Sequence, residues 1–93
     1  MSEVLQNLWK TIEDRKRTMP AGSYTAGLFA AGAPRISQKV GEEAVETAVA
    51  ALTEGNERLV SEMADLVYNC LVLLAAKGLT WEDVEAELAR RFK

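Results

Sequence analysis

Apolar residues recur along this chain every three or four positions, which is the spacing of an amphipathic α-helix. Ser2 precedes the first stripe and can cap a helix that fades into the basic run at 15–17. A loop with Pro20 and Gly22 follows, because both residues interrupt helices. The apolar positions of this first predicted helix are Val4, Leu5, Leu8, Trp9 and Ile12.

The segment 23–29 is ambiguous in its pattern. It is either a short helix capped by Ser23 or an ordered loop. Pro34 then fits the first turn of a long helix, because its missing N–H would lack a partner there in any case. That helix is predicted to run to about Glu54 and to stop at Gly55.

A third helix is predicted from Asn56, as N-cap, to the stop at Gly78. Its apolar side is very wide over 66–74, which indicates burial on more than one side and therefore a partner subunit. Thr80 and Asp83 have the spacing of a capping box at the start of a last helix. The inner face of that helix is predicted to consist of Trp81, Val84, Leu88 and Phe92. The pattern thus predicts an all-α chain of about four helices.

Composition limits the classes of protein to consider. With 93 residues the chain forms one domain, 1–93. A net charge of −3 argues against a nonspecific grip on nucleic acid. We expect neither a signal peptide nor a membrane span, and hence a cytoplasmic setting. The single cysteine, Cys70, excludes an intrachain disulfide and is predicted to be a small core residue.

Two acidic motifs carry the candidate chemistry: E-E-x-x-E at 42–46 and E-x-x-D at 62–65. Spacings of three and four place side chains on one helical face, so two packed helices could bring these acids together. Carboxylates at such short distances repel one another, and a cation is needed to offset the repulsion. Without histidine the ligands would all be oxygen, which suits Mg²⁺, Mn²⁺ or Ca²⁺. The acids are Glu42, Glu43, Glu46, Glu62 and Asp65.

The alternative to a metal site is a solvated acidic surface, and the residue pattern supports these two interpretations about equally. The metal interpretation gains because these acids lack the usual basic partners four residues further along, although Lys39 could form a simple salt bridge with Glu43. A di-iron site and a serine or cysteine nucleophile would need histidine, and no G-x-x-x-x-G-K loop is present. A Mg²⁺ cluster would favour a polyphosphate substrate. Lys39 lies one turn before Glu43 and could hold phosphate, as could Arg15, Lys16, Arg17 and Arg35.

The two acidic motifs resemble those of the all-α nucleotide pyrophosphohydrolases of the MazG type. The flanking residues are similar to the phosphoribosyl-ATP pyrophosphatase family, and the resemblance extends from about Leu5 to Arg91. The matching segments are Ser23-Tyr24-Thr25-Ala26-Gly27-Leu28-Phe29, Gln38-Lys39-Val40-Gly41-Glu42-Glu43-Ala44, Ala64-Asp65-Leu66-Val67-Tyr68, and Gly78-Leu79 with Arg90-Arg91.

This resemblance implies hydrolysis of phosphoribosyl-ATP to phosphoribosyl-AMP and pyrophosphate, the second step of histidine biosynthesis. It implies that the five acids hold Mg²⁺, that one of them activates water, and that Lys39 contacts phosphate. Arg15, Ser23 and Tyr24 are then expected near the substrate, although Tyr24 could equally be a core aromatic. Asn69 stands where the family often has histidine, so it can only offer a hydrogen bond.

The family also implies a helical bundle completed by homodimerisation, with the cyclohydrolase that acts next as a separate protein. Two alternatives remain open at this point. One is a house-cleaning nucleoside triphosphate pyrophosphatase of the same fold, which the flanking segments disfavour and activity on dUTP would favour. The other is a noncatalytic helical dimerisation module with an acidic face.

Overall fold

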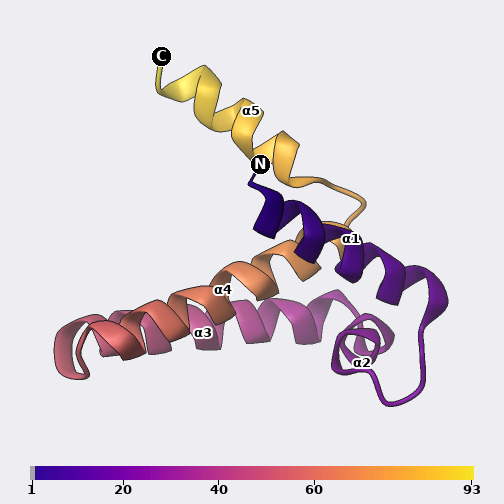
Figure 1. Cartoon of the computed structure of the whole chain (residues 1–93), viewed down its shortest axis with the longest axis horizontal. Coiled ribbons are helices and arrows are strands. Elements are labelled where there is room, and N and C mark those ends of the chain that lie inside the picture. The colour runs from indigo at the N-terminus through magenta and orange to yellow at the C-terminus, as the bar shows by residue number, and fades with distance from the viewer. Residues whose placement is uncertain (1) are drawn as a thin grey trace.

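The computed structural model describes residues 2–93, and every regular element in that range is a helix (Figure 1). The all-α prediction is therefore confirmed for this part of the chain, with five helices instead of about four. The additional helix is the ambiguous segment at 23–29, which forms α2. The helices are α1 (Glu3–Thr18), α2 (Tyr24–Ala31), α3 (Ala33–Thr53), α4 (Asn56–Ala76) and α5 (Trp81–Arg91).

Most helix ends follow the local signals in the sequence. The hydroxyls of Ser2 and Ser23 accept hydrogen bonds from backbone N–H groups in the first turns of α1 and α2. Thr80 and Asp83 form the predicted capping box of α5. The predicted N-cap at Asn56 is wrong. Gly55 occupies that position with a φ of 93°, so Asn56 is already the first helical residue and makes no side-chain cap.

Helices α3 and α4 form a long antiparallel hairpin, with α1 lying across the C-terminal half of α4 (Figure 1). Helix α2 packs near the start of α3 and also contacts α1 and α4. The core lies where these four helices meet, and full burial of one such side chain is worth about 1.5–3 kcal/mol. Its buried members are Ile12, Leu28, Ile36, Leu71, Val72 and Ala75. The hairpin end formed by the α3–α4 turn extends beyond this core.

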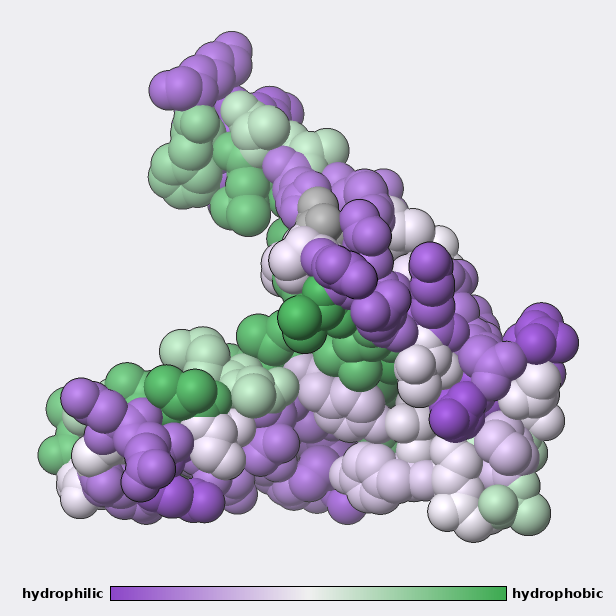
Figure 2. Space-filling model, viewed as in Figure 1, coloured by the Kyte–Doolittle hydropathy of each residue, from purple (hydrophilic) through white to green (hydrophobic). Residues whose placement is uncertain are grey.

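Large apolar surfaces remain uncovered in the protomer. Helix α5 points away from the bundle, and Figure 2 shows apolar residues along it and on the hairpin, either side of a hollow. Its predicted inner face is therefore not buried within one chain, since Phe92 is 75% exposed. A second apolar groove runs between α1 and α4, lined by residues that include Val4, Leu8, Val60 and Met63.

Helix α4 is long and apolar enough, by length and composition alone, to cross a membrane. Glu62 and Asp65 interrupt this helix, so the expectation that the chain has no membrane span is not contradicted. Only 28% of its most apolar window is buried within the chain, but the helix packs against α1 and α3 and carries the acids of the second motif. A core helix of a soluble protein passes the same test. Cys70, on this helix, is half-buried and not fully enclosed.

Candidate metal centre and substrate site

Three of the five predicted acids converge between the two helices of the hairpin. Glu43 comes from α3, while Glu62 and Asp65 come from α4, three residues apart on one face. One carboxylate oxygen of each lies within 4.8 Å of the others. Glu43 and Glu62 are 8% and 4% exposed, whereas Asp65 is open to solvent. The antiparallel packing of α3 and α4 thus creates a carboxylate cluster that has one exposed side.

The chemistry of this cluster fits a hard divalent cation. Oε2 of Glu43 and Oε2 of Glu62 are buried and have no hydrogen-bond partner. A buried carboxylate oxygen left in this state is costly unless a positive group compensates it. An all-oxygen donor set with one open side suits Mg²⁺, which keeps part of its water shell. These residues could therefore hold Mg²⁺ between α3 and α4.

Basic side chains already neutralise part of the cluster. Lys39 Nζ lies 3.4 Å from Glu43 Oε1, and Arg58 pairs with Glu62 one turn along α4. Arg58 also bonds Glu54, with 3.1 Å between Nε and Oε2. The Lys39–Glu43 ion pair considered from the sequence is therefore present, and both cations lie four residues before their acids, although none lies four residues after them. Sequence reasoning missed Arg58 because it considered positions after Glu62, although the i−4 spacing would have revealed it.

The other two acids occupy the edge of the site. Glu42 is exposed and lies outside the cluster. Its carboxylate accepts a hydrogen bond from Gln38 at 3.0 Å and lies within 4 Å of Lys39 and Arg35. Glu46 is exposed beside the cluster, and a hydrogen bond shared with Glu62, together with the charge of Glu43, raises its pKa. Like charges and a shared proton have this effect on neighbouring carboxylates.

Asn69 lies one turn after Asp65 and is only 3% exposed. Its Nδ2 donates to the Asp65 backbone carbonyl at 2.9 Å. Its Oδ1 is buried without a hydrogen-bond partner. The side chain therefore keeps one free acceptor, and it has no proton to exchange at neutral pH.

Tyr24 and Ser23 lie at the start of α2. Tyr24 is 61% exposed, so it is not a core aromatic, and it interacts electrostatically with Lys39. Burial alone would lower the pKa of Lys39, but Tyr24, Glu43 and Glu42 outweigh it, and the net shift is upward. Lys39 is therefore charged at neutral pH. Ser23 Oγ is used as the cap of α2 and accepts from the Ala26 N–H at 3.1 Å.

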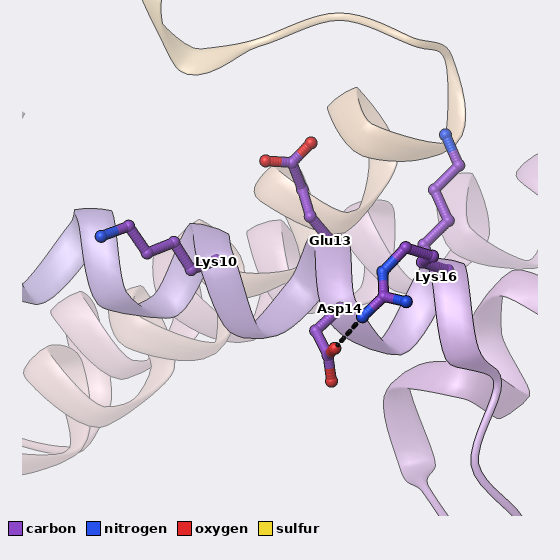
Figure 3. Close-up of a pocket in the computed structure, with 5 residues that line it drawn as sticks. Lys10, Glu13, Asp14 and Lys16 are labelled. Atoms are coloured by element: carbon purple, nitrogen blue, oxygen red, sulfur yellow. Dashed lines mark hydrogen bonds and ion pairs between the residues drawn. The ribbon is translucent and has the colours of Figure 1, made fainter.

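Arg15 belongs to the basic run on α1 and is largely neutralised there. Asp14 binds both Arg15 and Arg17, at 2.7 and 2.9 Å. Asp14 and Arg17, but not Arg15, border a charged hollow along α1, and Figure 3 shows its residues. Lys16 Nζ donates to the Ala75 carbonyl at 2.6 Å, near the C-terminus of α4. This hollow is lined by α1 residues and includes none of the five acids.

Comparison with known proteins identifies relatives over the full chain. Residues 5–92 match the family described as phosphoribosyl-ATP pyrophosphohydrolase. The phosphoribosyl-ATP pyrophosphatase of Metallosphaera sedula is 54% identical over 93 residues, which is all of both chains. The protein of that name from Pyrobaculum calidifontis is 58% identical over 90 residues, 97% of this chain and 96% of its own. The one from Saccharolobus solfataricus is 51% identical over 92 residues, 99% and 98% of the two chains.

Proposed function

The chain belongs to the phosphoribosyl-ATP pyrophosphohydrolase family, and we propose that Glu43, Glu62 and Asp65 hold the Mg²⁺ with which it works. The function is hydrolysis of phosphoribosyl-ATP to phosphoribosyl-AMP and pyrophosphate in histidine biosynthesis. The observation that carries the metal site is the pair of buried oxygens without partners, Glu43 Oε2 and Glu62 Oε2. A purely structural acidic face would have no reason to bury them.

Each edge residue has a task that its surroundings support. Bound Mg²⁺ supplies positive charge to phosphate oxygens and the leaving group. Glu46 is exposed beside the cluster, which leaves its carboxylate open to accept a proton from the attacking water. Glu42 holds Lys39 and Arg35 by its charge at the rim of the site. We propose Glu46 as a further ligand or as the base, because its carboxylate interacts with those of Glu43 and Glu62, and we propose Glu42 at the rim.

Substrate contacts are proposed for the polar residues that surround this rim. Lys39, held in its charged form, binds a phosphate oxygen, and the exposed Tyr24 lies beside it. Ser23 still has its hydroxyl proton to donate, because as a cap it only accepts. Asn69 offers its free Oδ1 as an acceptor. Arg15 would have to exchange Asp14 for a phosphate group.

A second copy of this chain is the proposed partner for the uncovered apolar surfaces. The segment 66–74 of α4 is largely covered within the chain, since Leu71 and Val72 are fully buried, but Val60 and Met63 of the same helix remain exposed. Phe92 of α5 is also exposed. Surfaces of this kind mark interfaces in soluble proteins. Light scattering after gel filtration should give twice the mass of one chain. A monomer at micromolar concentration would contradict the dimer. We also propose a cytoplasmic setting, in keeping with a biosynthetic enzyme family.

The activity is tested by incubating the purified protein with phosphoribosyl-ATP and Mg²⁺ and measuring pyrophosphate, with ATP and dUTP in parallel. We expect release from phosphoribosyl-ATP that EDTA abolishes. Glu62→Gln should abolish turnover, while Glu13→Gln on the exposed side of α1 should not. Release from dUTP instead would favour the house-cleaning enzyme. No release from any nucleotide would favour the noncatalytic dimerisation module.

A further inference from the structure

A hydroxyl pair joins two helices next to the acidic site. Thr25 Oγ1 of α2 and Tyr68 Oη of α4 are 2.5 Å apart, although the residues lie 43 positions apart in the chain. Both side chains are partly buried. The bonds of Glu42 and Asn69, by contrast, stay within one helix. The hydroxyl pair therefore links elements that local helix geometry does not hold together.

The positions of the two residues give this link its significance. Tyr68 lies three residues after Asp65, which places both on one face of α4. Thr25 directly follows Tyr24 in the first turn of α2. Tyr24 is 61% exposed on the turn that the pair anchors, and the Lys39 ammonium group of α3 lies 3.4 Å from Glu43. The hydroxyl pair thus ties the first turn of α2 to the helix that carries Asp65.

Helix α2 depends on such anchors. It has eight residues, and a helix of this length is unstable in isolation. Two of its residues, Ala26 and Leu28, are buried. Removing one hydroxyl of the pair leaves the other partly buried without its partner, which costs more than the net value of the bond. The orientation of the first turn, with Tyr24, therefore depends on the Thr25–Tyr68 bond.

We propose that the Thr25–Tyr68 hydrogen bond is a positioning element that holds the first turn of α2, with the exposed Tyr24, at the edge of the acidic site for substrate binding. This inference rests on the proposed substrate role of Tyr24 and Lys39. Neither hydroxyl belongs to the carboxylate cluster, so the bond acts on substrate binding and leaves metal binding unchanged. Loss of one net hydrogen bond from the anchor corresponds to an increase in KM of about three- to tenfold.

The test is a double-mutant cycle of Tyr68→Phe and Thr25→Val, both of which keep the shape of the side chain. We expect each single variant to raise KM for phosphoribosyl-ATP by about three- to tenfold. The double variant should raise KM by no more than either single, because the same bond is lost and no hydroxyl is left without a partner. The kcat value and the calorimetric Mg²⁺ affinity should stay within about twofold, a change below the smallest net value of one hydrogen bond. Thr25→Ser keeps the hydroxyl and should restore the wild-type KM.

The matched control is Thr53→Val, which removes a hydroxyl that bonds the Val49 carbonyl at 2.8 Å on the exposed end of α3. It should leave KM unchanged. Unchanged KM in both single variants would overturn the proposal. So would multiplicative effects in the double variant, or a loss of Mg²⁺ affinity.

A second readout separates this inference from the proposed function. If the wild-type protein releases no pyrophosphate from phosphoribosyl-ATP, the proposed function fails and KM has no meaning. Hydrogen–deuterium exchange of the α2 amides still tests the positioning role, because a loosened helix opens more often. Faster exchange in Tyr68→Phe and in Thr25→Val, but not in Thr53→Val, would support it. Unchanged exchange would overturn it.

Discussion

Replacing Asp65 with asparagine separates charge repulsion from metal binding. Asp65 lies within 4.8 Å of the two buried carboxylates of Glu43 and Glu62, and none of the ion pairs between described residues includes it. Asparagine keeps the size of the side chain and removes its charge. We therefore expect Asp65→Asn to stabilise the metal-free protein and to weaken the stabilisation by Mg²⁺.

The magnitude follows from Coulomb's law at the distance in the structure. Two unit charges 4.8 Å apart repel by about 0.9 kcal/mol in water and by about 3.5 kcal/mol at an effective dielectric constant of 20. Because Asp65 is exposed, the lower value applies, which gives about 2 kcal/mol for its two neighbours together. In a domain of this size that gain would raise the melting temperature by roughly 8–16 °C.

Magnesium should reverse the order of the two melting temperatures, so that the wild type becomes more stable than Asp65→Asn. A cation present at 100 times its Kd stabilises the wild type by about 2.7 kcal/mol, which exceeds the gain from relieved repulsion. Asp65→Asn lacks one of the three ligands, so it should benefit much less. The assay is thermal unfolding followed by circular dichroism, in EDTA and across a Mg²⁺ titration. Protein concentration is held constant, because association also raises the melting temperature.

Two results would refute this reasoning. A melting temperature at or below that of the wild type in EDTA would mean that Asp65 does not repel its neighbours in the folded protein. Equal stabilisation of both proteins by Mg²⁺ would mean that Asp65 is not a ligand. Glu13→Gln serves as the control, because it removes one exposed carboxylate from α1, away from the cluster. It should change neither the melting temperature in EDTA nor the stabilisation by Mg²⁺.

Two further predictions concern the same cluster. The raised pKa of Glu46, above its ordinary 4.5, means that the folded metal-free protein binds this proton more tightly than the unfolded chain. Its free energy of unfolding should therefore fall as pH rises from 4.5 through the raised pKa, as measured by urea unfolding. An identical slope in Glu46→Gln would contradict this. Arg58→Gln should lower the melting temperature in EDTA, since Glu62 loses its cation, and Mg²⁺ should restore part of the loss. An unchanged melting temperature would contradict that dependence.

Local signals in the sequence predicted the elements well, because caps and apolar stripes act over one or two turns. The capping box of Thr80 and Asp83 is confirmed. The N-cap predicted at Asn56 is wrong, because the left-handed backbone of Gly55 makes the turn one residue earlier. Residues 23–29 could not be decided from their pattern, because a short helix such as α2 depends on tertiary contacts.

The metal cluster could be predicted only in part. Glu62 and Asp65 share a face at their spacing of three, and Glu43 meets them. Glu42 could not also do so, because adjacent residues on a helix point about 100° apart. The Thr25–Tyr68 bond joins segments that no sequence period relates, so pattern reasoning had no access to it.

The pattern of apolar residues also does not show whether the same chain or a second chain covers them. The apolar stripe of α5 predicts an inner face, yet Leu88 and Phe92 are exposed in the protomer. The spacing of apolar residues shows which side of a helix is buried, but the same spacing arises whether the cover is another helix of the chain or a second copy. Only the three-dimensional arrangement shows that the chain alone leaves these residues open.

The α3–α4 hairpin has a consequence for the order of folding. Its three clustered carboxylates, Glu43, Glu62 and Asp65, are only about twenty residues apart in the chain, and a loop of that length closes at little entropic cost. Contacts so local form early, before pairings between distant segments such as α1 with α4. A cation at the proposed site would therefore meet its ligands as soon as the hairpin closes. On this proposal Mg²⁺ should speed folding as well as slow unfolding, and so take part in the assembly of the protein.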